Sequence, residues 1–442
     1  MFGFFFFLGG LYWIANALFV DIDAYLYLVP IAVAVIPAIL ALYFIAFAAF
    51  LHYFNNNHAL RFFILFVCGW VLIEILRTYL FTGFPWLAVG YSLMFEESLI
   101  QSASIFGVFG LSIIGISFAS IPFLLLHTSK ENIFVTISLA IMFVLNGAFG
   151  WYRLKAPTEY YDHYITLVQP NISQQDKIKP SRFSDNLNQL VSLTQTKSYN
   201  KSGYIVWPET ALGGYYELPV VRKIINNIVP PNNYLITGVE RFHNHRVYNS
   251  VVAYNDEGKV VAYHDKFHLV PFGEYLPFRK WFPEQMYNIS NGLIDFEAGD
   301  GPYTMSLGTL PSFSPLICYE SLFPKEIIHD KVRPMFLINF TNDAWYGDTP
   351  GPYQHFDMTR LRAVEYGIPM VRVANTGISA TVDSYGRIKA YLSLNTSGVI
   401  QQKIPSSLKN ISIFSQFGNS IVVILLVIIT VVNIFLYRER YT

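Results

Sequence analysis

Apolar residues are distributed unevenly along the chain. Residues 1 to 150 consist of nearly continuous hydrophobic runs, residues 155 to 410 form a mixed globular pattern, and one last apolar run follows at 419 to 437. A helix needs about 20 apolar residues to cross the core of a bilayer. The pattern therefore predicts about six spans, near residues 2–20, 25–51, 60–81, 99–127, 132–150 and 419–437.

The segment 77–98 is apolar and aromatic, but Gly83, Pro85 and Gly90 interrupt it. These residues disfavour a continuous spanning helix. We expect a loop at the outer membrane interface, where an aromatic ring such as that of Trp86 is well placed. The N-terminal segment has no basic region and no small-residue cleavage site, so it is interpreted as a retained span rather than a signal peptide.

Charged residues in the short loops predict the orientation. Cytoplasmic loops of membrane proteins carry an excess of Lys and Arg. Basic residues lie on one side of the predicted spans, at Arg61, Lys130, Arg438 and Arg440. Acidic residues lie on the other side, at Asp21, Asp23, Glu96 and Glu97. Both termini are then inside, and residues 155–410 are outside, which is the periplasm of a bacterium with two membranes.

The globular segment alternates short β-branched runs with helical or loop segments. Expected strands are 164–169, 203–207, 234–240, 249–255, 260–266, 314–320, 335–341, 370–375 and 379–384, and expected helices are 184–197 and 353–367. A hairpin turn is expected at 255–258, which reads Asn-Asp-Glu-Gly. Several strands are apolar throughout, which is typical of sheets covered on both faces. The pattern predicts a layered α/β domain attached to a multi-span α-helical membrane domain.

Composition narrows the class of protein. The chain of 442 residues is 53% hydrophobic and only 14% charged, whereas soluble proteins are about 25% charged. Its 30 basic and 30 acidic residues cancel, so no nucleic-acid partner is expected. Two cysteines cannot form a disulfide framework. Cys68 lies in an apolar run, which leaves Cys318 as a free thiol.

Polar residues occupy the ends of four predicted strands, at Glu209, Lys266, Cys318 and Asn342-Asp343. A carboxylate can take the thiol proton, and an ammonium can lower the thiol pKa and stabilise an oxyanion. Such a set performs acyl transfer through a thioester. Each residue also has an ordinary explanation: a packed core cysteine, a helix-capping glutamate and a solvated lysine.

Longer motifs favour the catalytic interpretation. The segments "VWPETAL" (206–212), "DKFHLVPFGEYLP" (265–277) and "LICYESLFP" (316–324) occur in this order. Together they resemble the Glu-Lys-Cys constellation of the nitrilase (carbon–nitrogen hydrolase) superfamily, which has an αββα sandwich fold. The segments 76–92 and 342–379 are similar to the apolipoprotein N-acyltransferase branch, in which a nitrilase-like domain precedes the last of several membrane spans.

The resemblance implies roles for individual residues. Glu209 would be the general base, Lys266 the oxyanion stabiliser and Cys318 the nucleophile, in the motifs quoted above. Glu274 would orient the lysine. Tyr319 and Glu320 would be structural and electrostatic neighbours of the thiol.

The reaction implied by the resemblance has two halves. The thiol takes an acyl chain from a phospholipid and passes it to the α-amino group of the N-terminal diacylglyceryl-cysteine of an apolipoprotein. Both substrates are anchored in the membrane, so we expect an apolar entrance. Its candidate residues are Arg77, Trp86, Trp345 and Tyr346, with a lid at 347–353. Ordinary packing is the alternative for the aromatic residues, and pairing with Glu74 is the alternative for Arg77.

The expected organisation has three parts: N-terminal spans at 1–153, a periplasmic catalytic domain at 159–405, and a C-terminal span with a short tail at 417–442. The expected location is the bacterial inner membrane, as a monomer without cofactor or metal. His264 and His268 are four residues apart, but they follow a strand and lack the helical geometry of a metal pair.

Two departures from the family pattern bear on these expectations. Family members usually have about eight spans, and the first segment here resembles their third; a misassigned start and a shortened form both explain this. Ile178 stands where many relatives carry a tryptophan near the mouth of the active site.

Three other functions remain open. The first is a membrane-tethered amidase or nitrilase that uses water as the acceptor. The second is a non-enzymatic transporter or scaffold, which would have no reason to keep Glu209, Lys266 and Cys318 together. The third is a thiol protease, in which Cys318 would need a partner such as His355, although no such signature surrounds the cysteine.

Overall fold

The computed structural model describes residues 1–21, 26–54, 58–199, 201–277, 295–329 and 332–438. The chain forms two compact units. The first, which we call the helical unit, comprises Met1–Pro157, Ala363–Gly367 and Leu408–Thr442. The second, the sheet unit, comprises Thr158–Arg362 and Ile368–Ser407.

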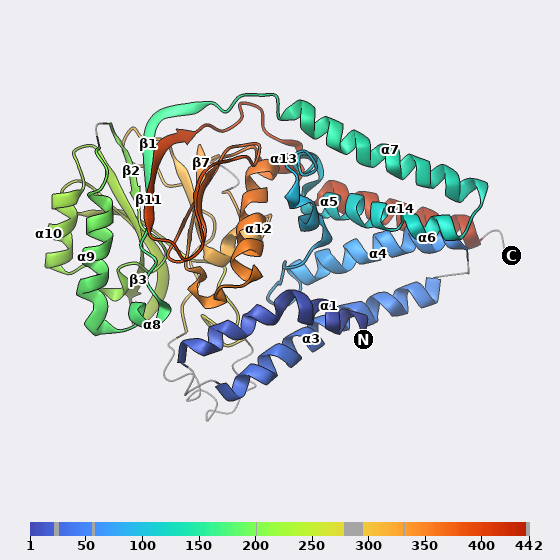
Figure 1. Ribbon diagram of the computed structural model, residues 1–442, viewed down its shortest axis with the longest axis horizontal. Helices are drawn as coiled ribbons and strands as arrows, with labels where there is room; N and C mark the ends of the chain where they lie inside the picture. Colours follow the sequence, from blue (N-terminus) through green and yellow to red (C-terminus); the bar gives the residue numbers. More distant parts are fainter. Residues whose placement is uncertain (22–25, 55–57, 200, 278–294, 330–331, 439–442) are drawn as a thin grey trace. The chain divides into compact units, whose positions relative to one another are not determined.

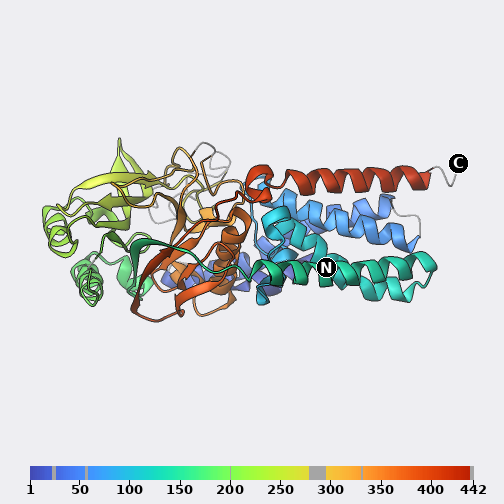
Figure 2. The same cartoon turned by 90° about the horizontal axis from the view of Figure 1, so that it is seen from above.

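Helices make up the helical unit (Figure 1). They are α1 (Phe2–Leu11), α3 (Val29–Phe54), α4 (Ala59–Tyr79), α5 (Ala103–Ala119), α6 (Ile121–Leu126), α7 (Lys130–Arg153), α13 (Ile413–Phe417) and α14 (Ser420–Arg438), with 3₁₀ helices η1 (Tyr12–Asp21), η2 (Leu26–Leu28) and η3 (Val89–Phe95). Helices α4, α7 and α14 run alongside one another in both views (Figures 1 and 2).

Among the residues that the structure describes, five helical segments are long and apolar enough to cross a membrane, in line with the prediction of about five spans before the globular segment. They are Phe2–Phe19, Leu26–Phe54, Ala59–Tyr79, Ala103–Leu126 and Lys130–Arg153. The sixth predicted span coincides with α14, whose apolar part, Ser420–Asn433, is shorter. Residues Ala103–Leu126 form one span although the backbone of Gly107 is non-helical, with φ of +63°.

The segment after α4 is irregular, as its glycines and proline predict. Arg77, in the last turn of α4, anchors it: its guanidinium donates hydrogen bonds to the carbonyl oxygens of Phe84, at 2.9 Å, and of Trp86. Glu74 accepts a hydrogen bond of 2.8 Å from the backbone N–H of Val89. Two buried charged side chains thus satisfy backbone groups that no regular element pairs.

The sheet unit contains two mixed sheets. The first has the order β11-β1-β2-β3-β4-β5 and the second has the order β10-β9-β8-β7-β6. Their strands are β1 (Tyr160–Gln169), β2 (Gly203–Val206), β3 (Tyr234–His243), β4 (Arg246–Tyr254), β5 (Val260–Asp265), β6 (Phe313–Ile317), β7 (Phe336–Thr341), β8 (Met370–Ala374), β9 (Ser379–Val382), β10 (Ile388–Leu392) and β11 (Gly398–Pro405).

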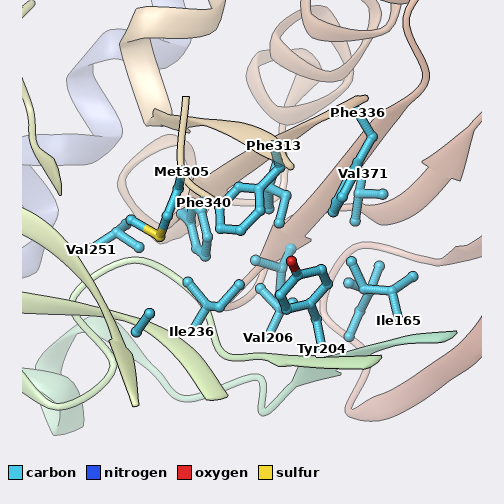
Figure 3. Packing of buried hydrophobic residues seen from close by; sticks show 14 of the residues in the cluster. Ile165, Tyr204, Val206, Ile236, Val251, Met305, Phe313, Phe336, Phe340 and Val371 are labelled. Atoms are coloured by element: carbon cyan, nitrogen blue, oxygen red, sulfur yellow. The ribbon is translucent and has the colours of Figure 1, made fainter. Parts of the chain in front are cut away.

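The two sheets face each other across a core of buried apolar side chains (Figure 3). Val206 and Ile236 come from the first sheet, and Phe313, Phe336 and Phe340 come from the second. Because the inner faces of both sheets are apolar, burial of this cluster joins them into one sandwich.

Helices cover the outer faces of the sandwich. The six-stranded sheet packs against α9 (Phe183–Thr194) and α10 (Pro219–Ile228) through a second apolar cluster. Helix α12 (Pro350–Tyr366) lies beside the five-stranded sheet (Figure 1). The short α8 (Gln174–Lys177), with 3₁₀ helices η4 (Pro180–Arg182), η5 (Gly213–Tyr215), η7 (Cys318–Leu322) and η8 (Asp343–Tyr346), completes the unit. The predicted layered α/β fold is confirmed.

Most predicted elements are present at the expected places. The turn between β4 and β5 is a hairpin, in which the Asn255 side chain accepts hydrogen bonds from the N–H groups of Glu257 and Lys259. Gly258 adopts φ of +70°, a conformation that favours glycine. The structure adds β10, β11 and α10, which the sequence pattern did not predict.

Candidate active site

Glu209 follows β2 on a tight turn. The residue is 6% exposed, and its Oε1 accepts a hydrogen bond of 2.8 Å from Nδ2 of Asn249 on β4. A Cβ atom at Gly238, on the neighbouring strand β3, would lie 2.6 Å from the Cα atom of Glu209. A glycine at this position therefore lets the turn approach the sheet closely and places the carboxylate over the strand end.

Lys266 follows β5, and its backbone N–H donates to the carbonyl oxygen of Asn249 at 2.8 Å. Its buried Nζ lies 2.9 Å from both carboxylate oxygens of Glu274 and 3.8 Å from Oε1 of Glu209. The ammonium is therefore held mainly by Glu274. Glu209 makes the longer contact with the ammonium, and its predicted role as the general base stays a prediction.

Glu274 is fixed by its own loop and by Asn249. Its Oε2 accepts a hydrogen bond of 2.7 Å from the N–H of Val270, and its Oε1 accepts one of 2.8 Å from Nδ2 of Asn249. The amide of Asn249 thus bridges the two carboxylates. This geometry suits a carboxylate that orients Lys266, and that role of Glu274 stays a prediction.

Cys318 begins η7 directly after β6 and is 6% exposed. Its φ is +52°, in the left-handed region that residues with a Cβ atom rarely adopt. Three donors meet its carbonyl oxygen: Oγ of Ser321 at 3.0 Å, Nδ2 of Asn339 at 3.2 Å and Nε2 of His355 at 3.3 Å. The cysteine therefore lies on a sharp strand-to-helix turn that neighbouring side chains hold in place.

Glu320 joins the segments that carry the lysine and the cysteine. One carboxylate oxygen accepts a hydrogen bond of 2.7 Å from the N–H of Phe267, and the other accepts one of 2.6 Å from the N–H of Ile317. Each donor is a direct neighbour of a candidate catalytic residue. Because Glu320 is fully buried, it fixes the spacing of the two backbones with charge-assisted hydrogen bonds.

The surroundings determine the protonation states. Burial raises the pKa of the Cys318 thiol to about 12; Glu209 adds to the rise and Lys266 opposes it. Burial likewise raises the pKa of Glu209, against the lowering effect of Lys266. Burial alone would lower the pKa of Lys266, but the charges of Glu274 and Glu209 reverse this and hold it above its usual range.

These directions bear on one prediction. The ammonium was expected to lower the thiol pKa, and Lys266 does so, but burial outweighs it and the net shift is upward. At neutral pH the resting site therefore contains a neutral thiol beside a lysine ammonium. A thiol in this state would need a nearby base to take its proton before it could act as a nucleophile.

The predicted entrance residues fall in two groups. Arg77 and Trp86 are buried in the helical unit, where Arg77 holds backbone carbonyls. In the sheet unit, Trp345 is 38% exposed, and the ring of Tyr346 lies 5.8 Å from that of His355. The entrance role of all four residues stays a prediction. Packing inside the helical unit accounts for the positions of Arg77 and Trp86.

The histidines considered from the sequence have other neighbours. His268 stacks on Phe323 at 3.6 Å, and its Nδ1 lies 2.6 Å from Glu326. Among the residues that the structure describes, no group of three or more His, Cys, Asp and Glu side chains is placed to hold a metal. His355 approaches Cys318, but it faces the carbonyl oxygen.

Sequence reasoning did not identify Asn249 and Lys177, which both contact Glu209. Asn249 stands at the start of a predicted strand, and only strand pairing brings it to both carboxylates. Lys177, at the end of α8, donates a hydrogen bond of 2.6 Å to the carbonyl oxygen of Glu209. Burial lowers the pKa of Lys177 to about 8. Its position just before Ile178, at a place already associated with the mouth of the site, was the available signal.

Comparison with known families agrees with this architecture. The Carbon-nitrogen hydrolase family matches residues 164–411, and the Apolipoprotein N-acyltransferase N-terminal domain matches residues 1–121. The protein therefore combines a carbon–nitrogen hydrolase domain with an N-acyltransferase membrane domain.

Curated relatives extend the similarity over nearly the whole chain. An apolipoprotein N-acyltransferase from Brucella melitensis is 38% identical over 424 residues, which are 92% of this chain and 79% of the relative. One from Rickettsia prowazekii is 38% identical over 443 residues, covering 98% of this chain and 88% of the relative. One from Rhodopseudomonas palustris is 33% identical, covering 99% and 85%. The chain belongs to the apolipoprotein N-acyltransferase family.

Proposed function

We propose that this protein transfers a fatty acyl chain from a phospholipid to the N-terminal α-amino group of a diacylglyceryl-modified apolipoprotein. The observation that carries the proposal is the buried set of Glu209, Lys266 and Cys318 at three strand ends. The described part of the same chain includes five apolar helices of spanning length. An acyl carrier whose substrates are both lipids needs a nucleophile and a membrane attachment, and this family combines the two.

The first half-reaction acylates the cysteine. Glu209 takes the proton from the Cys318 thiol as the sulfur attacks the ester carbonyl of the phospholipid. The ammonium of Lys266 stabilises the oxyanion of the tetrahedral intermediate. The carbon–oxygen ester bond then breaks, and the leaving alkoxide takes the proton from Glu209. The products are a lysophospholipid and a Cys318 thioester.

The second half-reaction regenerates the thiol. The neutral α-amino group of the acceptor attacks the thioester carbonyl, and Lys266 again stabilises the oxyanion. Glu209 takes a proton from the attacking nitrogen and returns it to the departing sulfur of Cys318. The raised pKa of Glu209 suits a group that accepts and releases a proton in each half-reaction.

We further propose that the protein is a multi-pass protein of the bacterial inner membrane, with the sheet unit in the periplasm. The support is the distribution of charges in the short loops, with Arg61 and Lys130 on one side and Glu96 and Glu97 on the other. Cysteine accessibility in intact cells tests the orientation. A periplasmic sheet unit requires that a cysteine introduced at the half-exposed Lys403 react with a membrane-impermeant maleimide.

Intact-mass spectrometry tests the mechanism. After incubation with phospholipid, the purified protein should gain the mass of an acyl chain through a hydroxylamine-sensitive bond. The Cys318→Ala variant should gain none, whereas Cys68→Ala should react normally, because Cys68 belongs to α4 in the helical unit. A wild-type protein that forms no adduct under turnover conditions would contradict the mechanism.

The acceptor distinguishes transfer from hydrolysis. Adding a diacylglyceryl-cysteine lipopeptide should discharge the adduct into an N-acylated lipopeptide with recovery of the free thiol. Release of free fatty acid or ammonia without N-acylation would instead identify an amidase or nitrilase. The same incubation without acceptor measures the background rate of hydrolysis.

A further inference from the structure

Cys318 occupies a backbone conformation that requires external support. A φ of +52° places its Cβ atom close to backbone oxygen, which makes the left-handed region unfavourable for residues other than glycine. Such conformations persist only where the surroundings impose them. The contacts that supply this support meet the carbonyl oxygen of Cys318.

The carbonyl oxygen of Cys318 is the point of attachment. Asn339 on β7 and His355 on α12 donate to it at 3.2 and 3.3 Å. Ser321 adds a third, more local donor at 3.0 Å. A carbonyl oxygen has two lone pairs, so three donors saturate it and fix the plane of the following peptide.

A buried arginine organises the two remote donors. Arg372 on β8 is fully buried, and its Nε donates to Oδ1 of Asn339 at 3.1 Å. This contact orients the Asn339 amide, because its oxygen must face the guanidinium and its nitrogen must then face Cys318. The same guanidinium donates through Nη2 to both oxygens of Asp343, at 2.9 and 3.1 Å.

Asp343 in turn positions His355. Its Oδ1 lies 2.9 Å from Nδ1 of His355, and Nη2 of Arg372 lies 3.0 Å from the same nitrogen. Nε2 faces the carbonyl oxygen of Cys318, which can only accept, so Nε2 must carry a hydrogen. The other ring nitrogen, Nδ1, has the donor Arg372 and the acceptor Asp343 beside it, so it has a hydrogen-bond partner whether or not it is protonated. The donation to Cys318 is thus maintained in both.

We propose that these side chains form a clamp that positions the nucleophile of the proposed acyl transfer. We call it the elbow clamp, because it holds the sharp turn at Cys318. It consists of Asn339, Asp343, His355 and Arg372. None of the four contacts the reacting atoms; they act on the peptide that bears Cys318. The sulfur is a nucleophile in one half-reaction and a leaving group in the other, so it must return to the same position in each cycle. A misplacement of about 1 Å can cost on the order of 10²-fold in rate.

The competing explanation is a buried polar network that only stabilises the fold. Two substitutions of His355 separate the explanations. In His355→Gln the side-chain amide nitrogen reaches the place of Nε2 and keeps a donor toward the Cys318 carbonyl. In His355→Asn the amide nitrogen reaches only the place of Nδ1, toward Asp343, and the donor to Cys318 is lost. Each variant therefore loses one buried hydrogen bond, but a different one.

The experiment measures three quantities in a Cys68→Ala background: the rate of Cys318 alkylation by iodoacetamide, the rate of thioester formation with phospholipid, and the melting temperature. We expect His355→Asn to slow alkylation and thioester formation by about tenfold, and His355→Gln by less than about threefold, with similar melting temperatures. His163→Asn on β1 is the matched control, because the ring of His163 contacts the loop residue Ser202 at 3.3 Å and is no part of the network around Cys318. Its rates should equal those of the parent.

Equal losses of rate in His355→Asn and His355→Gln, or losses that follow the melting temperature, would overturn the clamp. A slower Gln variant than Asn variant would also overturn it. The proposed function is judged separately. If the parent protein is alkylated but forms no thioester, the acyl-transfer reading fails, and the alkylation ratio of the two variants still decides whether the clamp positions Cys318.

Discussion

The two units bury charged side chains in different ways. In the helical unit, Arg77 donates to backbone carbonyls, and Glu74 accepts from a backbone N–H and from the Trp70 indole at 3.0 Å. In the sheet unit, buried charges pair with one another, as Lys266 does with Glu274 and Arg372 with Asp343. The first arrangement satisfies an irregular backbone; the second fixes charged groups at set distances, which is what catalysis requires.

The two units also differ in where their apolar surface lies. Many large apolar side chains of α3 and α7 are exposed, including Leu42, Ile45, Phe134 and Leu145. In the sheet unit the apolar side chains of β2 and β7, and Ile165, Leu167 and Val168 of β1, are fully buried between layers or beneath helices. An apolar exterior on helices of spanning length is expected for contact with lipid rather than water.

The largest expected effect on activity comes from removing one of the paired charges of the sheet unit. Lys266→Met keeps the length of the side chain but removes the ammonium, and it leaves Glu274 without its partner at 2.9 Å. We expect kcat/KM for lipopeptide acylation to fall by about 10³-fold through loss of oxyanion stabilisation. The matched control is Lys403→Met, which removes a half-exposed ammonium 2.9 Å from Asp162. Its activity should equal that of the wild type, and a Lys266→Met enzyme within tenfold of the wild type would refute the assignment.

The difference in apolar surface predicts that Leu→Ala substitutions destabilise the two units by different amounts. Leu167→Ala on β1 opens a cavity in a site that is 0% exposed, whereas Leu145 on α7 is 62% exposed. We expect Leu167→Ala to lower the free energy of unfolding by about 3 kcal/mol. We expect Leu145→Ala to lower it by less than about 0.5 kcal/mol. Thermal unfolding in detergent micelles measures both. Similar losses would mean that the face of α7 is packed rather than exposed to lipid.

The sequence predicted elements that depend on local patterns better than elements that depend on contacts between distant residues. Continuous β-branched runs such as that of β7 predicted their strands, because an apolar strand is recognisable by itself. Strands β10 and β11 mix polar and apolar residues at the sheet edges and were missed. Helix α10 (Pro219–Ile228) was also missed, although its buried residues Val221, Ile225 and Ile228 follow helical spacing and form a clear amphipathic pattern.

The candidate site shows the same division. Glu209, Lys266 and Cys318 were identified because each follows an apolar strand inside a recognisable motif. Asn249 and Arg372 were not, because their importance lies in pairing across strands. Interactions between residues far apart in sequence depend on the register of the sheets, which local patterns do not determine.

A smaller effect is expected for the charges of the helical unit. Arg77→Met removes two hydrogen bonds from a charged group to buried carbonyls, so we expect the free energy of unfolding to fall by about 2 kcal/mol. The KM for phospholipid separates this role from the predicted entrance role. A KM change below about threefold is expected for a structural residue. A tenfold increase in KM without loss of stability would instead support direct recognition of the phospholipid.

The smallest expected effect is the response of Cys318 to alkaline pH. Because burial raises the thiol pKa to about 12, almost no thiolate exists below pH 10. An ordinary thiol gains reactivity about tenfold per pH unit up to about 8.5. Cys318 should instead be alkylated through removal of its proton by Glu209. The rate should rise as that carboxylate ionises, at a pH above its ordinary value of about 4.3, because burial raises the Glu209 pKa. Once Glu209 is ionised, the alkylation rate should change by less than about twofold up to pH 10.

Replacement of the base provides the control for this profile. In Glu209→Gln the thiol has lost the group that removes its proton, so alkylation at pH 7 should be much slower. Its rate should then increase about tenfold per pH unit toward high pH, because only free thiolate reacts. A wild-type profile with an inflection near pH 8.5 would mean that the thiol titrates as an exposed group does. Burial and the neighbouring charges of the sheet unit would then not control the protonation of Cys318. The difference between the two units in how they bury charges would then have no bearing on catalysis.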